Sequence, residues 1–397
     1  MSLVSARIAR ISPSATIAVD AKAKQLAAQG RSIISFGTGE PDFATPDFVV
    51  EAAVRAARDP RNHHYSASSG LPQLREAVAD KTFADSGVKV DPGQVIITNG
   101  GKQAVFEAFA TLVNDGDEVL LPSPYWTTYP ESIALAGGRA VEVFAGAEHG
   151  YKVTPELLEA HVGERTRGIV LVSPSNPTGS VYSPRELRAL GEWVLGKGLW
   201  VLTDEIYQNI TYDGVRAASL LEVVPELTPR TVIANGVAKT YAMTGWRVGW
   251  LVAPPELATA AGTLQSHLSS NVSNVAQLAA LAALTGPQDA PAAMLEAFAR
   301  RRTSILAALD GIEGVVTPRP DGAFYAYPDV RALLGRDWHG RRVDTTLELA
   351  DLLLSEAGIA VVPGEAFGPS GYLRFSYALS DEDLAEGMRR FAAFLSE

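Results

Sequence analysis

Asn235-Gly236-Val237-Ala238-Lys239-Thr240-Tyr241-Ala242-Met243-Thr244-Gly245-Trp246-Arg247-Val248-Gly249 places one lysine among small and apolar residues, with an arginine eight positions later. Loss of hydration at such a place disfavours the charged ammonium, so Lys239 gains access to its neutral, nucleophilic form. Arg247 is a permanent cation whose guanidinium suits a phosphate. A nucleophilic lysine beside a phosphate-binding arginine predicts a pyridoxal-phosphate (PLP) site, with the lysine as the Schiff base. The alternative is a surface lysine that follows a strand.

The composition is typical of a soluble globular enzyme. The 397 residues exceed one ordinary core and favour two domains, with 47% hydrophobic and 20% charged residues. The net charge of −11 argues against a nucleic-acid partner or an anionic membrane surface, although an anionic substrate stays open. Cysteine is absent, which excludes disulfides, thiolate metal sites and cysteine nucleophiles. No apolar run approaches the roughly 18 residues of a spanning helix.

The N-terminal segment has some features of a targeting sequence. Residues 1–16 carry Arg7 and Arg10, and no acid precedes Asp20, which faintly resembles a transit peptide. The segment lacks an apolar signal core. We therefore interpret it as part of the mature protein and expect a cytoplasmic location.

Short apolar runs alternate with helical patterns between about residues 95 and 253. Because the runs are continuously apolar, they predict a mixed, mostly parallel central sheet covered by helices on both faces. Helix starts are well marked: Ser183-Pro184-Arg185-Glu186 forms a capping box, and Thr154-Pro155-Glu156 opens another helix. The predicted strands are Val95–Ile97, Glu118–Leu121, Gly168–Val172, Trp200–Leu202, Thr231–Ala234 and Val248–Val252.

The pattern changes after about residue 290. A long helix through Arg300-Arg301-Arg302 precedes shorter strands and two further helices near 345–357 and 381–395. The predicted strands here are Gly322–Tyr327, Ile359–Val362 and Tyr372–Tyr377. We predict an α/β fold in which residues 46–290 form a large PLP-binding domain. Residues 1–45 and 291–397 would form a smaller α+β domain built from both termini.

A strand-to-helix turn at Asn99-Gly100-Gly101-Lys102-Gln103 has the features of an anion site. It follows the strand at residues 95–98 and opens a helix over 104–112. Exposed backbone N–H groups and the helix N-terminus would cradle a phosphate. The alternative is a plain Gly-Gly turn.

Asp204 lies in Thr203-Asp204-Glu205-Ile206-Tyr207, at the end of a predicted buried strand, where open α/β sheets bind ligands. The pyridine nitrogen of PLP would be a partner for an ionised carboxylate there, and would stay protonated beside it. Tyr207 would donate to the ring oxygen. The alternative for Asp204 is an N-cap of the next helix.

Two further turns carry candidate ring contacts. Ser173-Pro174-Ser175-Asn176-Pro177-Thr178-Gly179 is a rigid turn that holds Asn176 at the sheet edge, opposite Tyr207. Pro122-Ser123-Pro124-Tyr125-Trp126-Thr127-Thr128-Tyr129-Pro130 offers Trp126 for stacking on a flat ring. A plain turn asparagine and a core tryptophan are the respective alternatives.

Arg374 lies between apolar residues in Gly371-Tyr372-Leu373-Arg374-Phe375-Ser376-Tyr377. A buried arginine requires an anion, which would be a substrate carboxylate or an internal salt-bridge partner. His63-His64 does not indicate a metal, because adjacent side chains in an extended segment diverge and no third ligand is evident. We expect no metal.

Together these segments resemble class I aminotransferases of PLP fold type I, specifically the bacterial aspartate aminotransferase branch that includes prephenate aminotransferases. The resemblance runs from Pro13-Ser14-Ala15-Thr16 through Gly37-Thr38-Gly39-Glu40-Pro41-Asp42-Phe43 to Arg374. It implies Lys239 as Schiff-base lysine and proton shuttle, Asp204 on the pyridinium, and Asn176 and Tyr207 on the ring oxygen. Trp126 would stack on the ring, where it and Asn176 also face the substrate. Gly100, Gly101, Lys102 and Arg247 would surround the phosphate.

The resemblance also implies a homodimer with shared active sites, because Tyr65 would reach the phosphate in the neighbouring subunit. Arg374 and the backbone of Gly39 would bind the substrate α-carboxylate. The implied reaction is ping-pong transamination between an amino acid and 2-oxoglutarate. In this branch, residues matching Lys102 and Thr16 recognise the distal carboxylate of aspartate or glutamate.

Two positions depart from common patterns. Many relatives have a hydroxyl residue where this chain has Gly236, so the cradle at residues 100–102 would hold the phosphate more on its own. Relatives that use prephenate usually carry a basic residue at the position of Ser12, and its absence favours aspartate. The alternatives are an aromatic or prephenate aminotransferase, or another PLP reaction such as β-elimination. A non-catalytic regulator would need an added basic DNA-binding domain.

Overall fold

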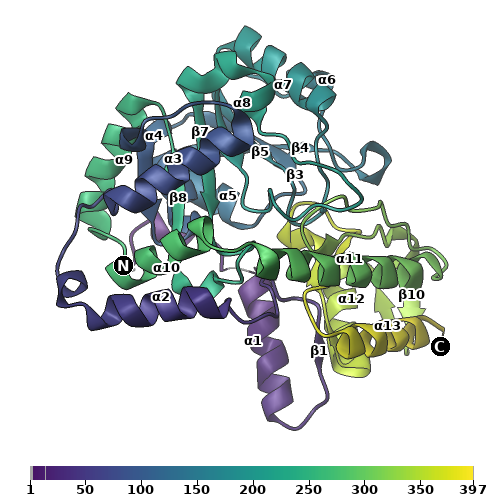
Figure 1. The fold of residues 1–397 in the computed structure, drawn as a ribbon. Coiled ribbons are helices and arrows are strands. Elements are labelled where there is room, and N and C mark those ends of the chain that lie inside the picture. The colour runs from purple at the N-terminus through teal and green to yellow at the C-terminus, as the bar shows by residue number, and fades with distance from the viewer. Residues whose placement is uncertain (1–2, 14, 397) are drawn as a thin grey trace.

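The computed structural model describes residues 3–13 and 15–396, and its centre is a seven-stranded sheet between two layers of helices (Figure 1). Every neighbouring pair of strands is parallel except those of β8, which runs antiparallel to both β2 and β7. The predicted mixed, mostly parallel sheet is confirmed. In spatial order the strands are β2 (Val95–Thr98), β8 (Gly249–Val252), β7 (Thr231–Gly236), β6 (Trp200–Asp204), β5 (Thr166–Val172), β3 (Glu118–Ser123) and β4 (Arg139–Phe144).

Five of the six predicted runs lie within strands of this sheet, and the sixth begins at Val248, one residue before β8; β4 was not predicted. The six share nearly complete burial, which is why their residues are continuously apolar. β4 forms one edge of the sheet, where Arg139, Glu142 and Phe144 are exposed and only Val143 is fully buried. Its sequence therefore resembles a polar segment more than a buried strand.

Helices cover the sheet and begin with clear capping signals. In the predicted capping box, Ser183 Oγ accepts a hydrogen bond from the Glu186 N–H at 3.3 Å, and Glu186 Oε2 accepts one from the Ser183 N–H at 2.7 Å. Thr154 caps α6 in the predicted way. The helices of this part are α2 (Asp47–Arg58), α3 (Pro72–Ser86), α4 (Gly101–Leu112), α5 (Thr128–Leu135), α6 (Pro155–Glu159), α7 (Pro184–Lys197), α8 (Leu220–Val223), α9 (Pro255–Leu268) and α10 (Asn274–Thr285).

The C-terminal part is a smaller α+β unit with a separate hydrophobic core that includes Phe36, Phe298 and Phe375. Strand β1 (Ile34–Ser35) pairs in parallel with β12 (Ile359–Ala360), so both ends of the chain contribute to it, as the sequence predicts. The domain boundaries at residues 46 and 290 stay predictions. The other elements are α1 (Ala15–Ala28), α11 (Asp289–Asp310), α12 (Thr346–Leu352) with a π turn (Leu353–Ala357), α13 (Asp381–Ser396), the antiparallel strands β13 (Val362–Pro363), β14 (Leu373–Ser376) and β9 (Tyr325–Ala326), and the hairpin β10 (Arg336–Trp338) with β11 (Arg341–Val343).

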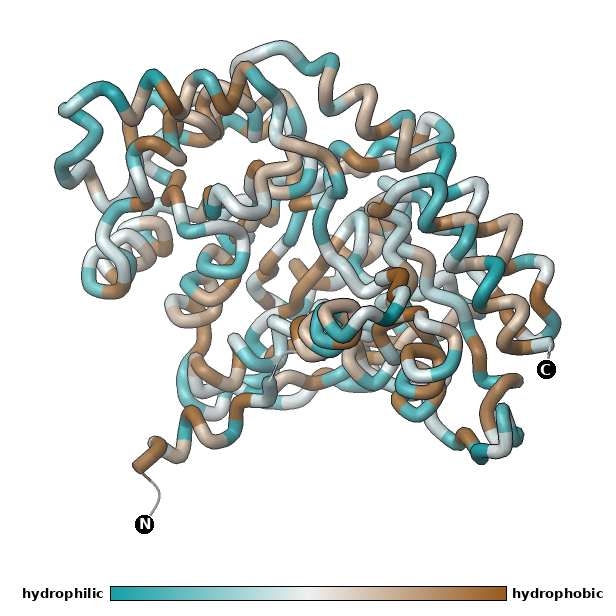
Figure 2. The backbone as a smooth tube through the Cα atoms, turned by 90° about the horizontal axis from the view of Figure 1, so that it is seen from below, coloured by the Kyte–Doolittle hydropathy of each residue, from teal (hydrophilic) through white to brown (hydrophobic). Residues whose placement is uncertain are grey.

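Hydrophobic and hydrophilic residues alternate along the peripheral helices (Figure 2), a pattern typical of helices that bury one side. Across residues 3–13 and 15–396, no helix combines the length and apolar character needed to cross a membrane. Since the parallel strands of the large sheet end at one edge, the turns that follow them meet there. That edge faces the smaller unit, and the candidate site lies between the two.

Candidate active site

A cavity of about 440 Å³ lies at the carboxyl edge of the large sheet. Its wall brings together most of the residues predicted from the sequence, although they are far apart along the chain. The predicted residues in this wall are Thr16, Gly39, Gly101, Lys102, Trp126, Asn176, Asp204, Tyr207, Lys239, Arg247 and Arg374.

Lys239 follows β7 and reaches across the cavity to the smaller unit. Its Nζ donates a hydrogen bond to the Gly39 carbonyl and lies 5.8 Å from the centroid of the Tyr207 ring. Burial lowers the pKa of Lys239 to about 8, against the opposing effect of the Glu40 carboxylate. A substantial fraction of the amine is therefore neutral near physiological pH, as a nucleophile or general base requires.

Asp204 ends β6 and is buried at the floor of the cavity. Its Oδ2 accepts a hydrogen bond from the Tyr129 hydroxyl at 2.8 Å, and its Oδ1 accepts one from the Ile206 N–H at 3.1 Å. Burial raises the pKa of Asp204, and these two hydrogen bonds act in the opposite direction. The N-cap alternative is wrong, because turns follow Asp204 and the next helix, α8, begins only at Leu220.

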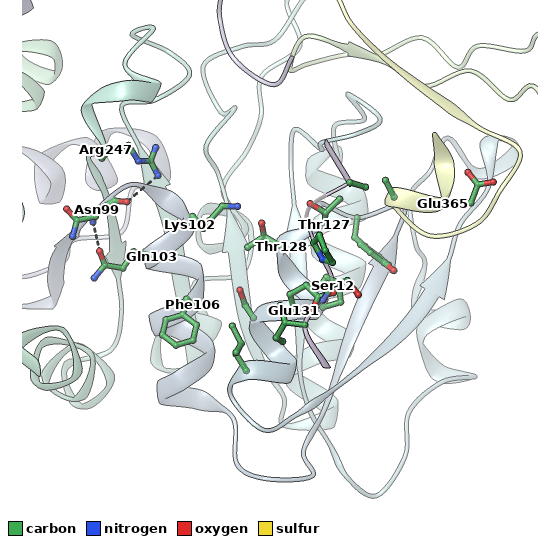
Figure 3. A pocket seen from close by; sticks show the side chains of 18 residues that line it. Ser12, Asn99, Lys102, Gln103, Phe106, Thr127, Thr128, Glu131, Arg247 and Glu365 are labelled. Carbon is green, nitrogen blue, oxygen red and sulfur yellow. Dashed lines mark hydrogen bonds between the residues drawn. The ribbon is translucent and has the colours of Figure 1, made fainter. Parts of the chain in front are cut away.

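The turn at residues 99–102 and Arg247 form a cationic corner of the cavity. Figure 3 shows Asn99, Lys102 and Arg247 from the side of an adjoining cavity. Gly100 has a φ of +82°, and a Cβ there would lie 2.6 Å from Arg247 Nη2, so this position requires glycine. Arg247 donates hydrogen bonds to the carbonyls of Thr244 (2.8 Å) and Asn99 (3.3 Å). Helix α4 begins at Gly101, which adds the partial positive charge of a helix N-terminus. The corner suits a phosphate dianion.

Lys102 extends from the same helix start toward the aromatic side of the cavity. Its Nζ lies 5.1 Å from the centroid of the Trp126 ring. Desolvation and the nearby Arg247 both lower the pKa of Lys102. An added anion in this corner would relieve the repulsion between the two cations.

Arg374 lies in β14 with 2% of its surface exposed. It donates hydrogen bonds to Asn176 Oδ1 at 3.0 Å and to the Gly37 carbonyl at 2.7 Å. In the part of the chain that the structure describes, no carboxylate forms a salt bridge with Arg374, and its Nε has no hydrogen-bond partner. The internal salt-bridge alternative therefore fails, and the buried charge requires an anion from outside the chain.

Asn176 and Tyr207 lie on the same wall as Arg374. Because Asn176 Oδ1 accepts from Arg374, its NH₂ group is left to donate into the cavity. The hydroxyls of Tyr207 and Tyr325 share a hydrogen bond of 2.7 Å. Burial raises the pKa of Tyr207 well above its usual value, so its hydroxyl stays protonated and can donate.

Among the residues that the sequence analysis did not select, Tyr129 and Glu40 line the cavity, and Tyr325 hydrogen-bonds to Tyr207 in its wall. Tyr129 stands three positions after Trp126 in a segment that was selected for its aromatics. Tyr325 lies in a predicted strand, where a tyrosine looks like an ordinary core residue. Glu40 accepts a hydrogen bond from the Thr244 hydroxyl at 2.6 Å, a contact across 204 residues that no local pattern indicates.

Other selected residues lie away from this cavity. Tyr65 is 91% exposed and does not contribute to it. Ser12 lines an adjoining cavity of about 680 Å³, which shares Lys102 and Arg247 with the first (Figure 3). The ring of His63 contacts the Ala57 carbonyl at 3.0 Å.

The structure gives a physical reason for Gly236. A Cβ at this position would lie 3.0 Å from both the Gly249 Cα and the Val248 carbonyl oxygen, because β7 and β8 approach closely there. A hydroxyl residue could enter only if these strands separated slightly.

Comparison with known proteins agrees with this geometry. The family model for aminotransferase class I and II matches residues 31–391. The chain belongs to this family. It is 58% identical to an aspartate aminotransferase of Streptomyces avermitilis, over 99% of this chain and 97% of that one, and 44% identical to an aspartate/prephenate aminotransferase of Cereibacter sphaeroides, over 99% of both. It is therefore a transaminase.

Solved structures of aspartate aminotransferases share the fold. The enzyme from Rhizobium meliloti superposes with a TM-score of 0.96 at 37% identity, covering 100% of this chain and 99% of that one. The enzyme from Thermus thermophilus with maleate gives a TM-score of 0.92 at 39% identity, with 100% of both chains covered.

The family implies PLP as cofactor, and the residues of the cavity fit it. The glycine-lined corner beside Arg247 fits the phosphate, while Asp204, Asn176 and Tyr207 offer one acceptor and two donors for the ring. Bound PLP supplies a carbonyl carbon that reacts with amines and a ring that stabilises negative charge at the substrate Cα. Ionised Asp204 would keep the ring nitrogen protonated. Lys239 would take the proton from the substrate Cα and pass it on.

Proposed function

We propose that this transaminase transfers the amino group of aspartate to 2-oxoglutarate by a ping-pong reaction. The observation that carries the proposal is Arg374, a buried arginine without a carboxylate partner, in the same cavity as Lys239 with its lowered pKa. A cation that binds a carboxylate and a neutral amine that takes a proton are the two groups that an α-amino acid requires.

Each residue of the cavity would have a role that follows from its position. Arg374 would bind the substrate α-carboxylate in bidentate fashion, supported by the backbone of Gly39. Neutral Lys239 would take the Cα proton and return it to the cofactor carbon. Trp126 would cover the ring, and Asn176 and Tyr207 would donate to its oxygen.

Specificity for a dicarboxylic donor rests on Lys102 and Thr16, which line the cavity together. The Lys102 ammonium can bind the second carboxylate of a dicarboxylic amino donor. An apolar amino donor has no such group, so Lys102 gives it no advantage. Maleate, present in the Thermus thermophilus structure, is a dicarboxylate, which supports this substrate class. Ser12 lacks the positive charge that a prephenate carboxylate would favour, so aspartate is preferred over prephenate.

We also propose a homodimer with shared sites. The Tyr65 side chain is 91% exposed and does not line the cavity of its own subunit, so it would extend to the partner's cofactor phosphate. Tyr65→Phe should weaken PLP binding. Two inactive variants, one altered at Tyr65 and one at Lys239, should recover activity when their subunits exchange. Confirmed heterodimers without activity would mean that each site is built from one chain. A cytoplasmic location would suit such an enzyme.

The experiment that tests the function is a panel of amino donors against 2-oxoglutarate, with prephenate as an alternative acceptor. Aspartate and glutamate should give the highest kcat/KM. Release of ammonia and pyruvate would indicate β-elimination, while a preference for phenylalanine or prephenate would indicate the aromatic or prephenate alternatives. Borohydride reduction and peptide mapping should place bound PLP on Lys239, and not on Lys24 or Lys102, which also line the cavity.

A further inference from the structure

The Tyr65 segment (residues 62–71) is held in place by buried side-chain amides. Asn274, at the start of α10, donates hydrogen bonds to the carbonyls of His64 (2.8 Å) and Asn62 (3.3 Å). Its Oδ1 accepts one from the Ser66 hydroxyl at 2.6 Å. The backbone on both sides of Tyr65 is thus fixed, although the Tyr65 side chain itself is exposed.

Two glutamines with 0% exposure hold the rest of this segment. Gln277 Oε1 accepts a hydrogen bond from the Leu71 N–H at 2.7 Å. Gln265, near the end of α9, donates through Nε2 to the Ser68 carbonyl. A buried amide that lost such partners would carry a substantial desolvation cost, so these contacts define the segment strongly.

Gln265 also contacts the strand that leads into the phosphate cradle. Its Nε2 donates to the Ile97 carbonyl of β2 at 2.7 Å, two residues before Asn99. Its Oε1 accepts a hydrogen bond from Gln103 Nε2 at 3.4 Å. Gln103 Oε1 in turn accepts one from the Asn99 N–H at 2.8 Å (Figure 3). The Gln265 side chain therefore contacts the Tyr65 segment directly and is connected to the cradle through Ile97 and Gln103.

The buried polar network around Gln103 has a desolvation cost, which indicates a role beyond packing. Gln103 Nε2 also lies 2.6 Å from Glu107 Oε1 and 2.9 Å from Ser269 Oγ, so its two N–H groups are shared among three acceptors. Glu107 is 0% exposed, and its Oε2 has no partner among the residues that the structure describes. An incompletely satisfied polar network is less stable than an apolar one of the same shape.

We propose that Gln265 is a positioning residue that links the phosphate cradle of its own subunit to the Tyr65 segment that this subunit extends to its partner. Each phosphate site of the dimer then depends on Gln265 from both subunits, in cis through β2 and Gln103 and in trans through Tyr65. The inference rests on the proposed dimer and on the proposed role of Tyr65.

The test uses heterodimers with one Lys239. One subunit carries Lys239→Ala, and PLP bound covalently to the remaining Lys239 is titrated by its visible absorbance. Gln265→Met, which removes the amide at similar volume, is placed either in the Lys239 subunit (cis) or in the Lys239→Ala subunit (trans). Each placement should raise the PLP dissociation constant about 5- to 30-fold, the range for one buried hydrogen bond.

Variants of two neighbouring glutamines distinguish the cis route through Gln103 from the trans route through Tyr65. Gln103→Met breaks the link to the cradle and leaves the contacts of the Tyr65 segment in place, so it should act in cis alone. Gln277→Met removes a contact of the Tyr65 segment and leaves the link through Gln103 in place, so it should act in trans alone. These variants carry the test if Gln265→Met does not fold. Gln94→Met is the matched control, because Gln94 donates to the Ala253 carbonyl at the opposite end of β2, at 3.1 Å, and should change neither value.

The deciding measurement combines Gln265→Met with Tyr65→Phe in the trans subunit. The trans effect of Gln265→Met should vanish in this background, because Tyr65 is its only route. A trans effect that persists would mean general loss of structure, and a missing trans effect would confine Gln265 to its own cradle; either overturns the proposal. If wild-type subunits bind no PLP, the proposed function fails; if Tyr65→Phe has no effect in trans, the proposed shared sites fail. In either case the inference falls with them.

Discussion

Tyr129 donates a hydrogen bond of 2.8 Å to Oδ2 of Asp204, and thereby joins α5 to the end of β6 beneath the cavity. Only the Ile206 N–H also bonds this carboxylate, at 3.1 Å to Oδ1, among the residues that the structure describes. Because burial raises the pKa of Asp204 and Tyr129 opposes that rise, Tyr129 helps to keep Asp204 ionised. Ionised Asp204 is what a protonated pyridine ring requires.

Tyr129→Phe should therefore lower kcat by about 5- to 30-fold, the equivalent of ~1–2 kcal/mol. The pKa of Asp204 should rise, so the acidic limb of the kcat profile should move to higher pH. Tyr125→Phe, in the adjoining cavity, is the control and should leave the limb in place. An unshifted limb in Tyr129→Phe would contradict the role of this hydrogen bond.

Lys102→Ala should lower kcat/KM for dicarboxylic amino donors much more than for other donors. Loss of a charge-assisted hydrogen bond should cost about 1.5–3 kcal/mol, or roughly 10- to 150-fold in kcat/KM for aspartate, with little change for alanine or phenylalanine. Arg374→Ala should damage all donors, since all share the α-carboxylate. Lys24→Ala is the matched control, because Lys24 also lines the cavity but pairs with Asp20 at 2.7 Å. Equal losses for all donors in Lys102→Ala would assign Lys102 to cofactor binding.

The rate at which apoenzyme takes up PLP should depend on the pKa of Lys239. Only the neutral amine attacks a carbonyl, so the rate should rise with pH and level off above the pKa of about 8. The Glu40 carboxylate raises that pKa, so Glu40→Gln should move the midpoint to lower pH. Stopped-flow absorbance measures both. Glu131→Gln, in the adjoining cavity, should not move it; a midpoint that Glu40→Gln leaves unchanged would refute this explanation.

Gly236→Ser tests whether the cradle lacks a hydroxyl for steric reasons. Because the new Cβ would lie 3.0 Å from Gly249 and Val248, we expect a loss of about 1–3 kcal/mol in the free energy of unfolding and no gain in PLP affinity. Gly245→Ser, where a Cβ meets no atom within 4 Å, is the control. Tighter PLP binding at unchanged stability would show that the space is available.

The sequence predicts the large sheet well because buried parallel strands are continuously apolar, and it fails at β4, where one face meets solvent. It also indicates Lys239, Asp204 and Arg374 as site residues, because a charged side chain among apolar residues requires a partner or a chemical role. It does not select residues whose meaning depends on a distant partner.

Tyr129, Tyr325 and Gln265 belong to that second group. Their hydrogen-bond partners Asp204, Tyr207 and Ile97 lie 75, 118 and 168 residues away along the chain. A tyrosine in a strand or a glutamine in a helix has ordinary packing roles, so only the folded arrangement reveals these contacts.

The most direct test of aspartate transamination is a single turnover without an acceptor. PLP-loaded enzyme mixed with aspartate should release one equivalent of oxaloacetate per bound cofactor and then stop, and addition of 2-oxoglutarate should restore the starting absorbance with formation of glutamate. Release of ammonia, or a turnover that yields no oxaloacetate, would contradict the proposed function.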